Sequence, residues 1–160
     1  MTRGPDHDEL NRLDREARAR LRGRVRAEVA RRGLASVMNR TRWEELRDAM
    51  ARLPFTPPYQ VQSILGPRED LWPDDRLTSQ GCWCAECLEP FWTIEWMRIL
   101  PGLWRQEGAL LPPRQVGDVT DALRAELTRL HLPFCEDARG FWIQGYSADD
   151  PTLGPPELAA

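Results

Sequence analysis

Long apolar runs are missing from this chain of 160 residues, and their absence excludes the simplest membrane architecture. No stretch of about 18 apolar residues occurs, so the sequence predicts no membrane-spanning helix. The first residues also lack the apolar segment and the small-residue cleavage site of a secretory signal peptide. We therefore expect a cytoplasmic protein with no membrane partner. In that compartment cysteines are reduced or metal-bound more often than they are paired in disulfides.

The common catalytic signatures are missing as well. The chain has two histidines and carries no G-x-S-x-G, no Walker loop and no H-E-x-x-H motif. His131 stands at the expected C-terminal end of a helix, where a cationic or hydrogen-bonding side chain satisfies terminal carbonyls, so capping explains it better than catalysis. His7 lies close to the N-terminus. These observations predict a protein that is not an enzyme.

Lysine is absent too: all 22 basic residues are arginine. Their distribution is uneven. Residues 1–33 contain ten Arg and six acidic residues, a net charge of +4, whereas the remainder contains twelve Arg and nineteen acidic residues, a net charge of −7. A body this acidic repels nucleic acid phosphates and attracts a basic protein. We therefore expect a protein partner and no nucleic acid partner.

A long helix is predicted at the N-terminus. Asp6 and Glu9 have the spacing of a capping box, and leucine and valine then recur every three or four residues as far as Gly33. This pattern predicts a helix over 8–32, within an N-terminal arm of residues 1–35. The apolar stripe is narrow, which leaves three alternatives open: a solvated helix along the body, a dimerising helix, or a basic arm that contacts a partner.

The body, residues 36–146, mixes helical and alternating patterns. A second capping box at Thr41 precedes a helix predicted over 42–52, and alternation predicts a strand over 59–65. A further amphipathic helix is predicted over 116–131. Long loops are predicted over 68–79 and 100–114, and a flexible tail over 147–160.

Two β-hairpins complete the expected fold. One pairs 82–87 with 91–99, and the other pairs 134–136 with 141–146. In the first hairpin, alternation places Trp92, Ile94 and Trp96 on the core face and Glu95 on the opposite face, where it meets solvent or a partner. The order of elements predicts an α+β fold: an antiparallel sheet of about five strands, two hairpins plus one strand, packed by two helices and preceded by the long N-terminal helix.

Four short motifs in this chain resemble those of a known family. They are Val37-Met38-Asn39-Arg40-Thr41-Arg42-Trp43, Thr93-Ile94-Glu95-Trp96, Leu130-His131-Leu132-Pro133 and Gly145-Tyr146. Their order and spacing resemble the bacterial domain-of-unknown-function family 6678, whose members open with a similar Met-Asn-x-Thr-x-Trp run and share a Thr-Ile-Glu-Trp strand. The resemblance covers about residues 36–146 and implies a small cytoplasmic α+β domain, without naming a catalytic residue or ligand. This chain departs from the family in its Cys-rich segment, residues 82–87.

All four cysteines of the chain, Cys82, Cys84, Cys87 and Cys135, form a candidate metal site. Cys84 and Cys87 have the C-x-x-C spacing of a zinc knuckle, and Cys82 shares one face of the predicted strand with Cys84. If the two hairpins are neighbours, Cys135 completes a tetrahedral site for structural zinc. The second C-x-x-C pair of a typical zinc site is missing, so the alternative is that the thiols stay free or pack as small apolar groups.

Acidic and tryptophan residues in the predicted loops are candidates for partner binding, because tryptophan dominates interface hot spots. They are Glu69, Asp70, Trp72, Asp74, Asp75, Glu86, Glu89 and Trp104. The alternative for Trp72 and Trp104 is that each fills a gap in the core. The resulting hypothesis is a cytoplasmic immunity protein that neutralises a cognate bacterial toxin domain with a basic cleft by direct binding. The alternative is a zinc-stabilised regulatory or scaffold domain that forms a homodimer through its N-terminal helix.

Overall fold

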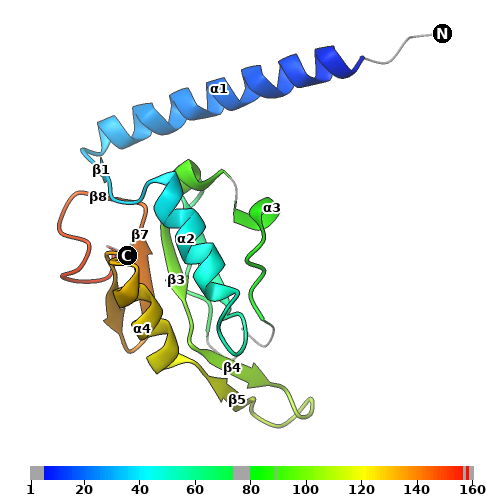
Figure 1. Cartoon of the computed structure of the whole chain (residues 1–160), viewed down its shortest axis with the longest axis vertical. Coiled ribbons are helices and arrows are strands. Elements are labelled where there is room, and N and C mark those ends of the chain that lie inside the picture. The colour runs from blue at the N-terminus through cyan, green and yellow to red at the C-terminus, as the bar shows by residue number, and fades with distance from the viewer. Residues whose placement is uncertain (1–5, 74–79, 89, 157, 159–160) are drawn as a thin grey trace.

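Asp6 caps the first helix of the chain, as its spacing to Glu9 predicts. The computed structural model describes residues 6–73, 80–88, 90–156 and 158, and in it helix α1 spans His7–Arg31. The Asp6 carboxylate accepts a hydrogen bond from the Glu9 N–H at 2.9 Å, and Gly33 follows the helix with a φ of 65°. The predicted helix is therefore confirmed. It lies across one end of the body, and its N-terminal half extends beyond the body (Figure 1).

Two shorter helices belong to the body, α2 at Arg40–Met50 and α4 at Thr120–Arg129. The N-cap of α2 is Asn39, whose side chain accepts a hydrogen bond from the Arg42 N–H at 2.9 Å. The predicted Thr41 cap is wrong, because both residue types can cap and Asn39 starts the helix earlier. Helix α4 begins later than predicted. Its first predicted residue, Val116, lies in a strand instead.

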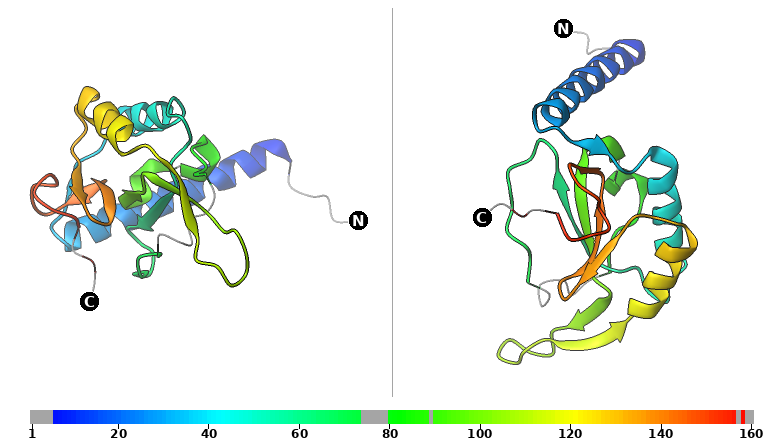
Figure 2. Two further views of the ribbon diagram at one scale, coloured as in Figure 1. Left: turned by 90° about the horizontal axis from the view of Figure 1, so that it is seen from below. Right: turned by 90° about the vertical axis from the view of Figure 1, so that its left-hand side faces the viewer.

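The central sheet is antiparallel and has the strand order β2-β3-β7-β6, formed by Tyr59–Ser63, Ile94–Ile99, Gly140–Gln144 and Cys135–Asp137. The predicted hairpin β6–β7 is confirmed, with Asp137 opposite Gly140. All six residues of β3 are buried, since this strand has a neighbour on each side and a layer over each face. Helices α2 and α4 cover one face, while the segment after β2 and the C-terminal segment lie over the other (Figure 2). The α+β fold is confirmed.

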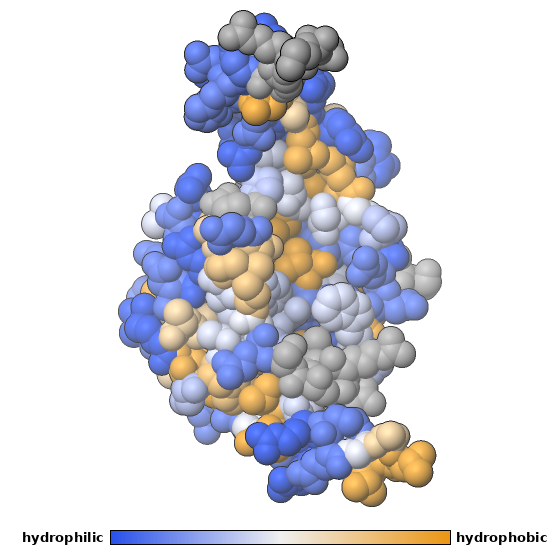
Figure 3. Space-filling view, turned by 90° about the vertical axis from the view of Figure 1, so that its right-hand side faces the viewer, coloured by the Kyte–Doolittle hydropathy of each residue, from blue (hydrophilic) through white to orange (hydrophobic). Residues whose placement is uncertain are grey.

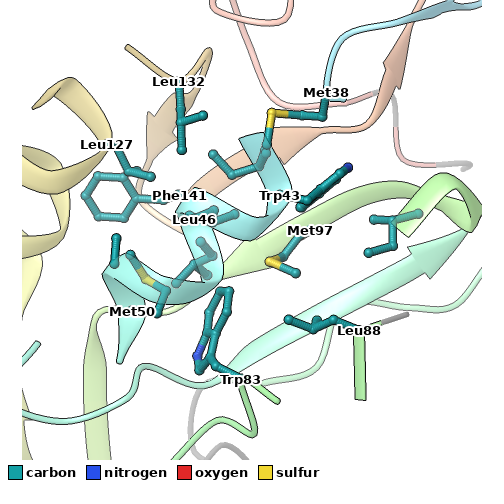
Figure 4. Close-up of a cluster of buried hydrophobic side chains, with 14 of the residues drawn as sticks. Met38, Trp43, Leu46, Met50, Trp83, Leu88, Met97, Leu127, Leu132 and Phe141 are labelled. Carbon is teal, nitrogen blue, oxygen red and sulfur yellow. The ribbon is translucent and has the colours of Figure 1, made fainter. Parts of the chain in front are cut away.

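The helices and the sheet bury one large apolar cluster between them (Figure 4). Leu46 and Met50 of α2, Leu127 of α4, and Met97 and Phe141 of the sheet are each at most 1% exposed. Burying a side chain of this size stabilises the fold by about 1.5–3 kcal/mol. This cluster is therefore the main source of stability in the body.

The cysteine-rich segment does not form the predicted hairpin. Residues 85–88 form the single helical turn α3 (Ala85–Leu88), residues 91–93 form a short 3-10 turn, and β3 pairs with β2 and β7 instead. The Cys-Trp-Cys alternation that suggested a strand has another cause. Trp83 and Leu88 point into the core while the cysteines between them face outward, so the central sheet has four strands rather than five.

Two smaller pairs of strands were not predicted. Strands β4 (Gly102–Arg105) and β5 (Arg114–Asp118) form a ribbon where a loop over 100–114 was predicted. Strand β1 (Ala35–Ser36) pairs with β8 (Tyr146–Ser147), which ties the end of α1 to the segment after β7. In the described part of the chain, no helix combines the length and apolar composition needed to cross a bilayer.

The close approach of β7 to β3 yields a test of the fold at Gly145. A Cβ atom there would lie 2.1 Å from the Ile94 carbonyl oxygen, which is backbone and cannot move away easily. We expect Gly145→Ala to lower the free energy of unfolding by about 2–3 kcal/mol, measured by urea denaturation. The control is Gly23→Ala in the middle of α1, where nothing lies within 4 Å and alanine should stabilise by about 0.5–1 kcal/mol. Equal effects of the two substitutions would contradict the packing described here.

Candidate functional site

Three thiols from one short segment lie together at the surface. The Sγ atoms are 3.1 Å apart for Cys82 and Cys84, 3.0 Å for Cys84 and Cys87, and 2.6 Å for Cys87 and Cys82. Cys82 and Cys87 are exposed and Cys84 is half-buried. Three sulfurs within this reach can hold a metal ion.

The thiol segment is fixed to the start of β2 by its neighbours. The indole of Trp83 donates a hydrogen bond to the Pro57 carbonyl at 2.8 Å and contacts the ring of Tyr59 at 4.7 Å between centroids. The Tyr59 hydroxyl in turn donates to the Cys82 carbonyl at 2.5 Å. Gly81 is required at this point, because a Cβ atom would lie 2.2 Å from the Pro57 carbonyl oxygen. The backbone that carries the thiols is therefore held in place by the residues at the start of β2.

The thiols affect one another's ionisation. The Cys87 thiol donates a hydrogen bond to the Cys82 sulfur, which raises the pKa of Cys87 to about 12 and lowers the pKa of Cys82. Burial, with a smaller contribution from the nearby thiols, raises the pKa of Tyr59 to about 12. The cluster thus favours ionisation at Cys82, whose sulfur accepts from Cys87, over ionisation at Cys87. A bound cation would take the place of the protons between the sulfurs.

Cys135 does not join this cluster, so the predicted four-cysteine site is wrong in that residue. Cys135 lies in edge strand β6, 9% exposed, and packs with Trp96 and Trp142 in a second apolar cluster. Burial raises the pKa of its thiol. It behaves as a small apolar residue, which was the alternative for the cysteines as a group.

A metal ion at the three thiols would need a fourth ligand and a small expansion. Zinc–sulfur bonds of about 2.3 Å in a tetrahedron separate the sulfurs by about 3.8 Å, more than the distances seen here. The Glu86 backbone N–H and, less strongly, the Cys84 thiol lower the pKa of the Glu86 carboxyl. No Glu86 oxygen joins the three sulfurs in the group of possible ligand atoms, so the described residues supply three ligands here.

A second candidate surface is a strap, residues 66–72, that covers the sheet face opposite the helices. Two buried glutamines of β2 hold it. The Gln60 amide donates to the Asp70 carbonyl at 3.0 Å and accepts from the Trp72 N–H at 3.1 Å. The Gln62 amide donates to the Pro67 carbonyl at 2.9 Å and accepts from the Glu69 N–H at 3.3 Å. Side-chain amides thus bond the strap much as a neighbouring strand would.

Trp72 ends the strap with a fixed backbone and an exposed ring. Its carbonyl accepts a hydrogen bond at 2.8 Å from Arg98, a residue of β3 that is 3% exposed. Its side chain is 44% exposed, and the neighbouring Glu69 and Asp70 are exposed as well. The backbone of this surface is therefore held in place before any partner arrives.

The other predicted partner residues are distributed over the molecule. Asp74, Asp75 and Glu89 lie outside the described residues. Glu86 is exposed in α3, beside the thiols. Trp104 is half-buried in strand β4 and borders a cavity of about 290 Å³ with Gln115 and Arg139, so it is less available than a loop residue would be.

Glu95 is buried, not solvent-facing as the sequence suggested. A β-bulge explains this, because Gln62 pairs with Trp96 and Ser63 with Ile94, leaving Glu95 as the extra residue. The bulge also places Ile94 in the large cluster under the helices and Trp96 in the second cluster with Trp142. The expectation of one shared core face for Trp92, Ile94 and Trp96 is therefore wrong.

Two arginines hold the Glu95 carboxylate, which is 6% exposed. Arg32 contacts both oxygens, at 3.0 and 2.5 Å, and Arg68 contacts both at 2.9 Å. The Glu95 carbonyl accepts a hydrogen bond from the Gly145 N–H at 2.7 Å. One residue of β3 thus connects the end of α1, the start of the strap and the end of β7.

Gln60, Gln62 and Arg98 were missed as site residues in the sequence, and Glu95, expected to meet solvent or a partner, instead binds two arginines. A signal was present, since each is a polar residue at a regular position within a run of strand-forming residues. Such residues are exposed when one sheet face meets water. Here the strap and the C-terminal segment cover that face, and this cover cannot be seen in the strand itself (Figure 2).

His131 follows helix α4 in the left-handed conformation, with a φ of 52°. Its backbone N–H donates to the Thr128 carbonyl at 3.0 Å, so the terminal carbonyls are bonded by the backbone. The side chain is exposed and forms no hydrogen bond with the described residues.

The chain belongs to a family of unknown function, DUF6678, whose model matches residues 25–150. The match confirms the family suggested by the four motifs and extends it at both ends, into the last part of α1 and past β8. Residues before 25, which include the part of α1 that extends beyond the body, lie outside it. No curated protein and no solved structure matches the chain.

The buried ion pair provides a stability test. We expect Glu95→Gln to lower the free energy of unfolding by about 2–3 kcal/mol, because it leaves Arg32 and Arg68 without a charged partner. The matched control is Glu44→Gln, which removes a surface ion pair with Arg40 whose side chains are 36% and 73% exposed. That change should cost less than about 1 kcal/mol. Urea denaturation measures both, and a Glu95 effect no larger than the control would refute a structural role for the pair.

Proposed function

We propose that this family member is a non-catalytic protein-binding domain, an immunity protein that neutralises a cognate toxin by binding its basic cleft through the strap. One observation carries the proposal. Trp72 has its backbone bonded on both sides by buried side chains, Gln60 and Arg98, while its ring stays 44% exposed. An exposed tryptophan on a fixed backbone is the form that interface anchors take.

Charge supports the same surface. Glu69 and Asp70 precede Trp72 on the strap and are exposed, and residues 34–160 carry a net charge of −7. Opposite charge accelerates encounter with a basic cleft, and a preorganised surface loses less conformational entropy on binding. Because rim charges act mainly on the association rate, binding should weaken as salt concentration rises.

Co-expression with the product of the neighbouring gene tests the proposal. We expect a tagged chain to co-purify with that protein and to suppress its toxicity. Trp72→Ala should reduce the affinity at least tenfold, corresponding to a hot-spot loss of about 1.4 kcal/mol or more, without changing the unfolding midpoint. Leu153→Ala, which truncates an 84% exposed residue in the C-terminal segment, is the control and should bind normally.

A second variant separates presentation of the strap from direct contact. Gln60→Met keeps the volume of a residue that is 1% exposed but removes both of its hydrogen bonds to the strap. It should slow association while the contact side chains are unchanged. If no neighbouring gene product co-purifies, the immunity proposal is wrong. If Trp72→Ala binds the partner normally, the interface does not include the strap.

The thiol cluster favours a second candidate function, a zinc-stabilised regulatory or scaffold domain. It would form a homodimer through α1, where Leu10 and Leu13 are 51% and 45% exposed. Hydrophobic surface is visible along this helix and at the far end of the β4–β5 ribbon (Figure 3). The supporting observation is the approach of three Sγ atoms to within 3.1 Å of one another.

Metal binding is directly measurable. The purified chain should contain equimolar zinc by elemental analysis, and Co²⁺ should give the visible absorption of tetrahedral thiolate coordination. Cys84→Ser should abolish both signals, while Cys135→Ala should keep them, since Cys135 lies elsewhere. Affinity should fall as pH is lowered, because protons compete for the thiolates. Retention of metal by Cys84→Ser, or its absence from the unmodified chain, would contradict the zinc site.

A further inference from the structure

A cavity of about 250 Å³ lies between α1 and the body, where two of the motifs and the segment before a third meet. The first motif contributes Met38, Asn39, Arg40 and Trp43, and the last contributes Gly145 and Tyr146. The third segment enters just before Thr93-Ile94-Glu95-Trp96, through Phe91 and Trp92. Neither the strap nor the thiol cluster uses this cavity.

Backbone pairing brings the motif segments together. The Gly145 carbonyl accepts a hydrogen bond from the Val37 N–H at 2.9 Å, and Ser36 pairs with Tyr146 in the β1–β8 ladder. The Tyr146 hydroxyl donates to the Trp92 carbonyl at 2.8 Å. Hydrogen bonds between segments that are distant in the sequence therefore fix the walls of the cavity.

Aromatic rings form much of the lining. Trp43, which is 2% exposed, stacks on Phe91 with 5.9 Å between centroids and nearly parallel planes. Trp92 and Tyr146 are half-buried and border the same space. Asn39 and Ser36 add polar groups at exposed positions. Such a lining accommodates a flat apolar group that makes a few polar contacts at its edge.

Arg22 supplies a positive charge from α1. Its guanidinium lies over the Trp92 ring, 5.2 Å from the centroid, and its charge opposes the rise in the pKa of Tyr146 that burial causes. Among the described residues Arg22 forms no ion pair with a carboxylate. Arg22 lies before the family match, whereas the other lining residues lie within it, including Arg40, which pairs with Glu44 at 2.7 Å.

We propose that this cavity binds a small ligand that carries a carboxylate or phosphate on an aromatic ring. The ring packs among Trp43, Trp92 and Tyr146, and the anion pairs with Arg22. The Asn39 amide, whose oxygen caps α2, and the Ser36 hydroxyl, which donates to the Met38 carbonyl, add the polar groups at the edge of the ligand, with the Asn39 NH₂ as the donor. A guanidinium pairs with carboxylate or phosphate through two N–H groups, and the contact with Trp92 restrains this one beside the cavity.

Three probes test this site on the full chain. Indole-3-acetate presents a carboxylate, phenyl phosphate presents a phosphate, and indole-3-acetamide is the neutral match of the first. We expect saturable binding of at least one anion by NMR titration, with shifts in tryptophan indole N–H signals, and at least tenfold weaker binding of the acetamide than of the acetate if the carboxylate binds. Which of the two anions binds more tightly identifies the head group.

Arg22→Gln should weaken binding of the anion at least tenfold, while Arg24→Gln, the same charge change at a neighbouring position that does not border the cavity, should leave it unchanged. Circular dichroism and the unfolding midpoint establish that both variants fold. The proposal is overturned if neither anion binds in the millimolar range. It is equally overturned if Arg22→Gln binds as well as the unmodified chain, or if the acetamide matches an acetate that binds.

Discussion

The buried carboxylate of Glu95 joins three parts of the molecule that the sequence keeps far apart. Its side chain pairs with Arg32 at the end of α1 and Arg68 at the start of the strap, while its carbonyl bonds the N–H of Gly145. This arrangement depends on a single bulge near the start of β3, which turns a polar residue inward at one end of the sheet. A buried charge must be paired to be tolerated, so the position of Glu95 fixes the positions of both arginines.

The two faces of the sheet are covered in different ways, and the proposed partner surface lies on the less usual one. Under the helices, apolar side chains pack against one another as in most α+β domains. On the other face, Gln60, Gln62 and Arg98 hold a segment without regular secondary structure by its backbone groups. A surface segment held in this way can keep an exposed tryptophan in one place, which a loop bonded only to water could not do.

Local signals in the sequence predicted local structure well. Asp6, Gly33 and the leucine spacing define α1, and the Asp137–Gly140 turn defines the β6–β7 hairpin. Predictions failed where a pattern had two physical explanations. The alternation around Trp83 fits a strand as well as a surface loop anchored by one inward indole, and alternation around Glu95 cannot reveal a bulge. Three thiols close in sequence were correctly grouped, whereas Cys135 required knowledge of which strands are neighbours.

The pairing of β1 with β8 has a consequence for how the domain can be used in evolution. Ala35 lies opposite Ser147, so the chain enters the body beside the point where its C-terminal segment turns back over the sheet, with Leu158 packed against the second apolar cluster. Inserting or permuting the body therefore has to keep Arg32 on one side of this junction and the C-terminal segment on the other, because both pack on the sheet. The projecting half of α1, which precedes the family match, can change without touching either of them.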